Sequence, residues 1–418
     1  MSLNKIVSIK AAALILITGL ISACSSDDVK EAPAELEDFI ERVKIVEVWD
    51  KSIGEGTDGR YLFLKPAIYG DTLYVADTEG LLLAIDKKTG ETKWQHKLLE
   101  DVSGGVTADD ENLYYSTFNG DVVALRRASL AETEAGIFSG WWTEKPAPVE
   151  ELWRQKLTSE ALAAPQVNQR LVVVQTIDGK VTAFGKETGE LSWRFESDEP
   201  VLSLRGTASP FVDDQLTVTG FANGELVALE NSTGAPVWRT QVGVPSGRTE
   251  LERLVDVDGK VLRYEQLMFS AAFNSNLKAL DYFSGREFWS RALSSSKSVS
   301  NGYLSVYAST GEGRILSIDR NTKSVIWEQK KLAYRRLTSP VVFDGSVLVA
   351  DFEGYIHALS QTDGSIIGRT EIDSDGIRTD MFVDDGVLYV YGNGGTLAAL
   401  TLEILTAPKL KKKPDADE

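Results

Sequence analysis

The chain has 418 residues, of which 43% are hydrophobic, and its formal net charge at pH 7 is −18. This apolar content is sufficient for a large buried core, and the length alone would predict two or three domains. The excess of acidic residues argues against binding to nucleic acid, because contacts with phosphate backbones require clustered Lys and Arg. The balance indicates a folded protein whose acidic surface meets protein partners.

The first 23 residues have the pattern of a secretory signal. Lys5 and Lys10 supply positive charge, and the apolar run at 11–21 is shorter than the roughly 20 residues that a membrane-spanning helix needs. The run ends in ISAC, which resembles a bacterial lipobox, so Cys24 is expected to become the lipidated N-terminus. Cys24 is the only cysteine in the sequence, and the alternative is an incidental buried thiol. By resemblance to enterobacterial-type lipoproteins, Ser25 favours sorting to the outer membrane.

After an acidic tether, residues 24–44, one phrase recurs through most of the chain. Residues 224–238 read GELVALENSTGAPVW, and three other copies also place Gly and Trp fourteen residues apart. Aligned on the Gly position, the copies number eight, with a usual spacing of about 40 residues. The aligned positions are Gly80, Gly120, Gly179, Gly224, Ser275, Gly313, Gly354 and Gly395, followed by Trp94, Trp153, Trp193, Trp238, Trp289, Trp327 and, in the seventh copy, Gly368.

Each copy predicts four short antiparallel strands. In residues 170–184, RLVVVQTIDGKVTAF, two apolar runs flank a tight turn, which is typical of a hairpin. A Pro-led segment before the hairpin and a strand ending at the Trp complete the unit. A single sheet of this kind has two partly apolar faces, and a ring of sheets buries both. We therefore expect an all-β fold, an eight-bladed β-propeller of four-stranded antiparallel blades over residues 45–402.

The eighth copy has no fourth strand after it, whereas residues 45–49, IVEVW, form a strand with no copy before it. The N-terminal strand should therefore complete the eighth sheet and close the ring, which removes open sheet edges. Two segments are expected outside the ring. They are an insertion at about residues 126–152 and a charged, disordered C-terminal tail at residues 403–418.

We find no sequence pattern for catalysis, a metal or a cofactor. The two histidines, His96 and His357, have no Cys or second His near them, so zinc spacing is absent. Neither standard glycine-rich phosphate loop is present. The letters DVDG at 256–259 resemble the start of a calcium loop but lack the later ligands. A catalytic serine assembled across blades is the alternative that the residues leave open.

The repeated phrase resembles that of the quinoprotein alcohol dehydrogenases, which use pyrroloquinoline quinone. Their quinone site carries a disulfide between adjacent cysteines, which a chain with one cysteine cannot form. Four other stretches resemble the BamB family, the propeller lipoproteins of the outer-membrane β-barrel assembly machine. They are VLSLRG (201–206), TELERLVDVDG (249–259), RRLTSPVVFDG (335–345) and LVADFEGYIHAL (348–359).

The BamB resemblance implies a non-enzymatic scaffold without a cofactor, lipid-anchored to the outer membrane and facing the periplasm. Its partners would be the POTRA domains of the central barrel subunit, the rest of the assembly complex and unfolded outer-membrane proteins. The contacts would come from Leu202, Leu204 and Arg205 on one loop and from Asp256 and Asp258 on the next. Alternatively, the leucines pack on the ring and Arg205 pairs internally with one of the two acids. The alternative functions are a periplasmic quinoprotein dehydrogenase and a propeller with another protein partner.

Overall fold

A computed structural model of the chain describes residues 31–127, 148–198, 200, 202–204 and 208–414. The expected signal peptide, Cys24, most of the expected insertion and Arg205 lie outside the described residues. Residues Ala34–Glu418 make up one compact unit, and the description below concerns this unit alone.

The described residues form strands joined by turns, without a helix. The strands make eight antiparallel sheets of four strands each, so the expected all-β class is confirmed. Seven sheets use four consecutive strands, and the remaining sheet combines strands from both ends of the chain. In the second sheet the outer pair of strands continues to Arg127 and Val149, which narrows the expected insertion to the residues between these two.

The first four sheets contain β2 (Ala67–Tyr69), β3 (Thr72–Ala76), β4 (Leu81–Asp86) and β5 (Thr92–Lys97); β6 (Val102–Ala108), β7 (Asn112–Thr117), β8 (Asp121–Arg127) and β9 (Val149–Lys156); β10 (Gln166–Val167), β11 (Leu171–Gln175), β12 (Lys180–Gly185) and β13 (Leu191–Glu196); and β14 (Phe211–Val212), β15 (Leu216–Gly220), β16 (Glu225–Glu230) and β17 (Pro236–Gln241). The next three contain β18 (Leu262–Tyr264), β19 (Leu267–Ala271), β20 (Asn276–Asp281) and β21 (Glu287–Ala292); β22 (Ser300–Asn301), β23 (Ser305–Ser309), β24 (Ile315–Asp319) and β25 (Val325–Gln329); and β26 (Val341–Phe343), β27 (Ser346–Ala350), β28 (Tyr355–Ser360) and β29 (Ile366–Glu371). The last sheet has the order β30 (Phe382–Asp384), β31 (Val387–Tyr391), β32 (Thr396–Lys411) and β1 (Phe39–Ser52).

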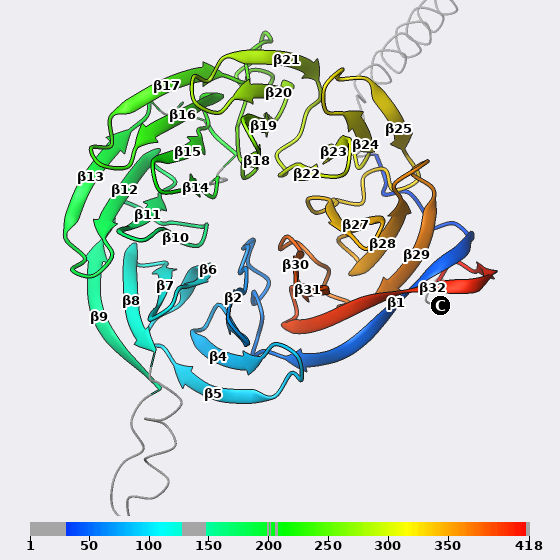
Figure 1. The fold of residues 1–418 in the computed structure, drawn as a ribbon, viewed down its shortest axis with the longest axis horizontal. Helices are drawn as coiled ribbons and strands as arrows, with labels where there is room; N and C mark the ends of the chain where they lie inside the picture. The colour runs from blue at the N-terminus through cyan, green and yellow to red at the C-terminus, as the bar shows by residue number, and fades with distance from the viewer. Residues whose placement is uncertain (1–30, 128–147, 199, 201, 205–207, 415–418) are drawn as a thin grey trace, which may run out of the picture. The chain divides into compact units, whose positions relative to one another are not determined.

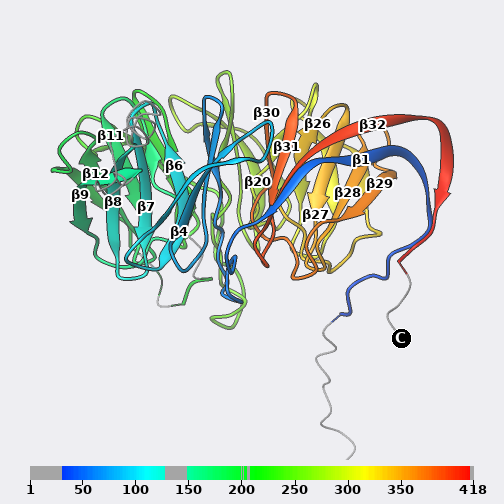
Figure 2. The same cartoon turned by 90° about the horizontal axis from the view of Figure 1, so that it is seen from below.

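The sheets stand side by side around a central axis, which Figure 1 shows in a view along that axis. Within a sheet we call the strands A to D from the axis outward, so β1 is strand D of the last sheet. Figure 2 shows the unit from its edge, with the strands running between two broad faces. Each face therefore consists of turns and connections, and the strands form the body between them.

The repeated Trp lies between neighbouring sheets, as its place on strand D predicts. Trp238 is 8% exposed, and its indole Nε1–H donates to the carbonyl of Tyr282 in the next sheet at 3.0 Å. A glycine in the next C–D turn provides the space, because a Cβ on Gly285 would lie 2.6 Å from the Trp238 ring. The same bond to the following sheet is made by Trp49, Trp153, Trp193, Trp289 and Trp327.

The glycine that stands at the first aligned position of most repeats brings two kinds of connection together. Gly224 has a φ of +81°, which few other residues adopt, and its carbonyl accepts the N–H groups of Val242 and Gly243 just after strand D. Equivalent bonds to the residue after strand D are accepted by Gly80, Gly120, Gly179 and Gly354. The B–C turns and the D–A connections therefore share one face of the unit, which we call the D–A face.

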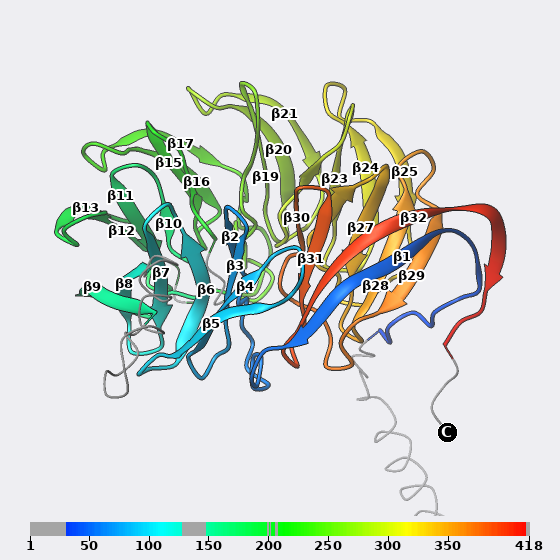
Figure 3. The same cartoon turned by 60° about the horizontal axis from the view of Figure 1, so that its bottom comes forward.

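The first and last strands extend further than the sequence predicts. β1 begins at Phe39 and β32 continues to Lys411, and these two residues pair across the ribbon that Figure 3 shows at the edge. The carboxylate of Glu41 is buried there, 3.3 Å from the Lys409 ammonium and 3.5 Å from that of Lys411. Opposite charges across two strands stabilise their pairing. The tether expected at 24–44 and the tail expected at 403–418 are therefore both shorter.

Gly368 stands at a Trp position because β1 occupies the space that the indole ring fills elsewhere. A Cβ on Gly368 would lie 2.5 Å from the carbonyl oxygen of Val43. Val43 and Ile45 of β1 pack instead into a buried cluster with Ala358 and Ile367 of the seventh sheet. The N-terminal strand thus contacts two sheets, the one it belongs to and the one before it.

Candidate functional site

The two loops expected to bind a partner lie together on the D–A face. Residues 197–210 connect β13 to β14, and residues 242–261 connect β17 to β18. Ser203 of the first loop and Asp256 and Asp258 of the second line the same small cavity of 10 Å³. The loops of two neighbouring sheets therefore meet, as the strand order predicts.

The first loop presents its two leucines at the surface. Leu202 is 46% exposed and Leu204 is 39% exposed. Side chains of this size that remain in solvent on a loop are suitable apolar anchors for a protein partner. Arg205 and its expected internal pairing fall outside the part of the chain that the structure describes.

Asp256 is not a surface residue, which corrects the expectation that its carboxylate faces a partner. It is 2% exposed, and the N–H of Phe273 donates to its backbone carbonyl at 2.7 Å in an isolated antiparallel bridge. The next residue, Val257, is fully buried, and its N–H donates to the carbonyl of Phe221 at 3.3 Å. This backbone pairing draws Asp256 beneath the surface, where it shapes the loop.

Asp258 lies closer to the surface and is half-buried. Burial raises the pKa of its carboxyl to about 6, and the nearby charge of Lys297 opposes this shift. Its Oδ1 atom has no hydrogen-bond partner among the described residues. A buried carboxylate oxygen without a partner is unfavourable, so a donor supplied by another molecule would stabilise the charged form.

Our sequence analysis missed a further apolar side chain on the second loop. Leu251 is 71% exposed and lies within a turn closed by a capping box. The N–H of Glu252 donates to Thr249 Oγ1, and the N–H of Thr249 donates to the Glu252 carboxylate, both at 3.2 Å. The backbone N–H groups of Arg248 and Thr249 both donate to the Glu252 carboxylate, and these bonds, the one from Arg248 first, lower the pKa of Glu252. The T-x-x-E pattern could have revealed this turn from the sequence.

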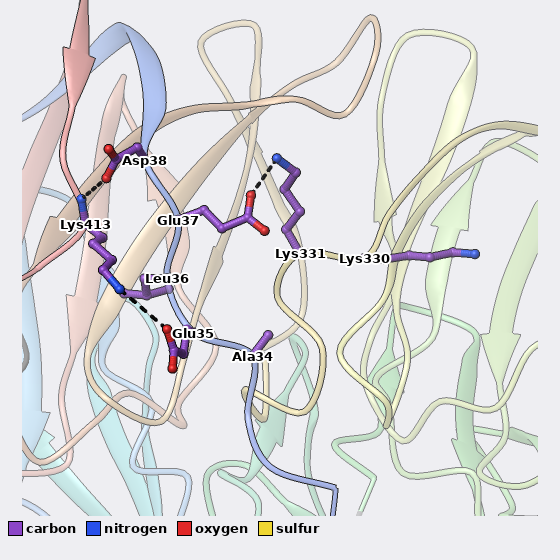
Figure 4. A pocket seen from close by; sticks show the side chains of 8 residues that line it. All are labelled: Ala34, Glu35, Leu36, Glu37, Asp38, Lys330, Lys331 and Lys413. Atoms are coloured by element: carbon purple, nitrogen blue, oxygen red, sulfur yellow. Dashed lines mark hydrogen bonds and ion pairs between the residues drawn. The ribbon is translucent and has the colours of Figure 1, made fainter.

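A second region lies beside the segment that precedes β1. An open pocket of 660 Å³ is lined on one side by residues 34–38 and on the other by Lys330 and Lys331 (Figure 4). Lys331 pairs with Glu37 at 2.8 Å, and the backbone N–H of Lys413 donates to Asp38 at 2.8 Å. The first contact holds the N-terminal segment against the D–A connection that follows the sixth sheet, and the second holds it against the residues that follow β32.

A buried network of charged side chains contacts residues 34–38. Asp351 is fully buried, 2.6 Å from Arg335 Nε and 2.8 Å from His357 Nε2. Arg369 Nε donates to His357 Nδ1 at 3.3 Å, so the proton of the neutral imidazole lies on Nε2, facing Asp351. Both arginines also donate to backbone carbonyls of residues 34–38, at 3.1 and 3.2 Å. The network fixes the N-terminal segment and contains no nucleophile.

Neither region has the composition of a metal site or a membrane span. In the described ranges, no group of three or more His, Cys, Asp or Glu side chains could hold a metal ion. No helix long and apolar enough to cross a membrane occurs in these ranges either. On the D–A face, the two adjoining loops carry exposed leucine side chains.

Comparison with known proteins identifies the family. A family model described as "Outer membrane protein assembly factor BamB" matches residues 46–133, 145–329 and 330–407. The outer membrane protein assembly factor BamB of Pseudomonas aeruginosa is 38% identical over 394 residues, which cover 94% of this chain and 99% of the relative. This chain belongs to the BamB family. The resemblance seen in the four sequence stretches is thereby confirmed.

Solved structures agree with membership of the BamB family. The crystal structure of BamB from Moraxella catarrhalis matches with a TM-score of 0.74 at 26% identity, covering 85% of this chain and 99% of that one. The quinohemoprotein alcohol dehydrogenase of Comamonas testosteroni matches with a TM-score of 0.62 at 14% identity, covering 85% of this chain and 76% of that one. The second likeness shows a shared fold alone. The close relatives are named as assembly factors and not as enzymes.

Proposed function

We propose that this BamB-family chain is a non-enzymatic scaffold of the outer-membrane protein assembly complex. In this role it binds the periplasmic POTRA domains of the central barrel subunit and aids the folding and insertion of outer-membrane β-barrel proteins. The match over nearly the full chain to proteins named outer membrane protein assembly factor BamB supports the general role. The meeting of two loops with exposed apolar side chains supports the location of the binding site.

The proposed contacts differ in one respect from those expected from the sequence. Leu202, Leu204 and Arg205 contact the partner from the first loop, and Asp258 does so from the second. Asp256 acts beneath them, because its buried position lets it fix the loop but not touch a partner. Binding of a partner donor to Asp258 would favour its charged form and would lower its raised pKa.

The proposed location follows from the N-terminus. Cys24 would carry the lipid that anchors the chain to the outer membrane, facing the periplasm. Strand β1 would close the ring of an eight-bladed propeller, because it completes the sheet of β30 to β32 from the other end of the chain. A closed ring has no open sheet edge and is a rigid support for the loops of the D–A face.

Co-purification with the POTRA domains tests the site. We expect Leu204→Ala combined with Arg205→Ala to abolish binding while the melting temperature is unchanged, because truncating a desolvated, partnered charge typically costs about 2–5 kcal/mol. Leu304→Ala is the matched control, since Leu304 is 55% exposed in a turn between strands A and B on the opposite face. Retained binding by the double variant would contradict the proposed site.

The quinoprotein alternative is tested separately. We expect the purified protein, incubated with pyrroloquinoline quinone and calcium, to show neither a bound quinone spectrum nor dye-linked alcohol oxidation. Turnover above that of the free quinone would favour the dehydrogenase alternative over the scaffold.

A further inference from the structure

Three lysines stand at the central axis on the D–A face, and we call them the axial lysines. Lys65 and Lys260 each lie two residues before a strand A, β2 and β18 respectively, and Lys297 lies three residues before β22. Strand A is the innermost strand of every sheet, as Figure 1 shows. The three side chains therefore start from three different sheets at the same end of the axis.

Hydrogen bonds from backbone N–H groups to side-chain oxygens of the next sheet confirm this arrangement. The N–H of Lys260 donates to Ser298 Oγ at 3.0 Å, and the N–H of Ser298 donates to Ser339 Oγ at 3.1 Å. The N–H of Ser339 then donates to Asp380 Oδ1 at 3.1 Å. The residues that precede strand A in four successive sheets are thus linked around the axis.

The ammonium groups extend toward other sheets. Lys260 Nζ lies 2.9 Å from Gln166 Oε1 of the third sheet. Lys297 Nζ lies 5.3 Å from the ring centre of Phe63, which precedes the first sheet, and Lys65 Nζ lies 5.5 Å from that of Phe382 in the last sheet. The partners of the axial lysines are therefore one neutral amide and two aromatic rings.

No carboxylate of the described residues lies within 4.0 Å of these three ammonium groups, although the chain as a whole carries a formal charge of −18. Asp258 is an acid whose titration Lys297 influences, and Asp380 already accepts bonds from the N–H and the hydroxyl of Ser339. Neither carboxylate makes an ion pair with an axial lysine within 4.0 Å.

The environment of Lys260 disfavours its charge. Lys260 is partly accessible to solvent, but burial of its ammonium end first, and the charge of Lys65 second, lower the pKa of Lys260 to about 8. A nearby anion would relieve both effects, because an opposite charge favours the protonated form.

We propose that the axial lysines form a binding site for the carboxylates of an acidic peptide segment from a partner protein. Two features favour a peptide over a dense polyphosphate. The overall acidic charge repels a polyanion. Salt screens charges that are more than about 10 Å away, so the lysines determine the electrostatic attraction of a group bound next to them. Phe63, Phe382 and Gln166 each lie against one of the lysines, which suits carboxylates on a chain that also carries apolar and amide groups.

A labelled peptide provides the test. A ten-residue peptide of alternating Glu and Leu is added to the full mature chain, and binding is measured by fluorescence anisotropy at low salt. We expect the same peptide with Gln in place of Glu to bind at least tenfold more weakly. The variant Lys65→Gln, Lys260→Gln, Lys297→Gln should lose at least tenfold in affinity, and the corresponding triple Arg variant should retain binding.

The matched control removes the same total charge elsewhere. Lys88, Lys156 and Lys330 are exposed lysines at the periphery, each paired with an acid, and their replacement by Gln should leave affinity within twofold. If the triple axial variant does not fold, Lys260→Gln alone is measured, with a loss of at least threefold expected. Equal binding of the Glu and Gln peptides, or unchanged binding by a folded axial variant, overturns the proposal.

Two further measurements separate the alternatives. Tripolyphosphate that binds through the axial lysines, in the absence of binding by the Glu peptide, would overturn the assignment to an acidic peptide. The Leu204→Ala, Arg205→Ala variant should bind the Glu peptide normally, because neither residue belongs to the axial lysines. The axial site and the proposed POTRA site can therefore fail independently.

Discussion

At the scale of single residues, the glycines of the repeat have two roles that can be separated. Gly234 and Gly345 both have positive φ angles, +71° and +75°. A Cβ on Gly234 would lie 2.7 Å from the Trp193 ring, whereas one on Gly345 would meet no atom within 4 Å. Gly234 therefore provides space for an indole ring in addition to its backbone conformation, and Gly345 provides the conformation alone.

This difference gives the first prediction. Gly345→Ala should lower the free energy of unfolding by about 1 kcal/mol through backbone strain. Gly234→Ala should cost about 1–3 kcal/mol more, because the methyl group forces the Trp193 ring to move. Chemical denaturation of the two variants measures both values. Equal losses would show that the contact between sheets tolerates the methyl group.

His357 makes the stability of the protein depend on pH. Burial lowers the pKa of His357, although Asp351 opposes the shift. Burial would raise the pKa of Asp351, but His357 and Arg335 lower it overall. Below pH about 6.5 an unfolded histidine takes up a proton that the folded one resists, so the unfolded state binds more protons. Stability should therefore fall from pH 7 to pH 5, and the low pKa of Asp351 extends the loss to more acidic pH.

The second prediction isolates the histidine. His357→Gln should reduce the loss of unfolding free energy between pH 7 and pH 5, by up to about 1.4 kcal/mol per pH unit. Denaturation midpoints of the two proteins at several pH values provide the measurement. His96→Gln is the comparison: burial also lowers the pKa of His96, but His96 is only half-buried and lies outside the network, so a smaller reduction of the slope is expected. The same pH slope in the His357→Gln variant and the original chain would rule out this role.

At the scale of elements, β1 contributes to the core of the fold, whereas the residues beyond β32 lie at its surface. β1 is strand D of its sheet, and the indole of Trp49 donates to the carbonyl of Lys87 in the next sheet at 3.0 Å. Trp49 is 8% exposed, so it is part of the core. Residues 412–414 follow the last strand and are exposed or half-buried at the surface.

The third prediction compares two truncations. Removal of residues 31–52 should prevent folding or strongly lower the melting temperature, because β32 would lose its outer partner and expose an edge. Trp49→Ala alone should cost about 3–5 kcal/mol. Removal of residues 412–418 should cost less than about 1 kcal/mol, since the described contacts that it takes away, the ion pair of Lys413 with Glu35 and the bond from its N–H to Asp38, are exposed to solvent. Similar melting temperatures for the two truncations would contradict the role of β1 in ring closure.

The elements differ in how far the sequence predicts them, and the difference is physical. The sheets were predictable because each repeat contains its own turns and most contain a Trp. Five of these rings contact a glycine of the following sheet, namely Trp49, Trp153, Trp193, Trp238 and Trp327. The start of β1 at Phe39 was not predictable, because it depends on the ion pairs of Glu41 with Lys409 and Lys411 near the other end of the chain. The burial of Asp256 likewise depends on a backbone bridge to Phe273 in the following sheet.

The candidate site was likewise predictable from the sequence only in part. The strand order predicts that the two loops share a face, and Leu202 and Leu204 are exposed on it. The sequence could not show that Asp351, Arg335 and Arg369 surround His357, because neither histidine has a recognisable motif around it. Contacts that recur in every repeat can be read from the sequence, whereas contacts made once between distant segments require the structure.

At the scale of the whole molecule, the fixed N-terminal segment limits how far the unit can lie from its proposed anchor. The N–H of Ala34 donates to the carbonyl of Ala333 at 2.9 Å, and Arg335 donates to the carbonyl of Ala34 at 3.1 Å. Ala34 is ten positions after Cys24, and a fully extended chain over ten positions spans at most about 36 Å. A lipid on Cys24 would therefore keep the D–A connection at Ala333 within that distance of the membrane surface.

The fourth prediction tests the anchor itself. Each methylene of an acyl chain contributes about 0.8 kcal/mol to membrane binding, and stable anchoring needs more than one chain. Cys24→Ala should therefore move the protein into the soluble periplasmic fraction without changing its melting temperature, because Cys24 precedes the compact unit. Ser25→Ala is the control and should remain in the membrane fraction. Cells without the central barrel subunit are used, so that a partner cannot hold the variant at the membrane. If Cys24→Ala still sediments with outer membranes from these cells, a contact other than the lipid must bind the unit there, and the limit of about 36 Å no longer applies.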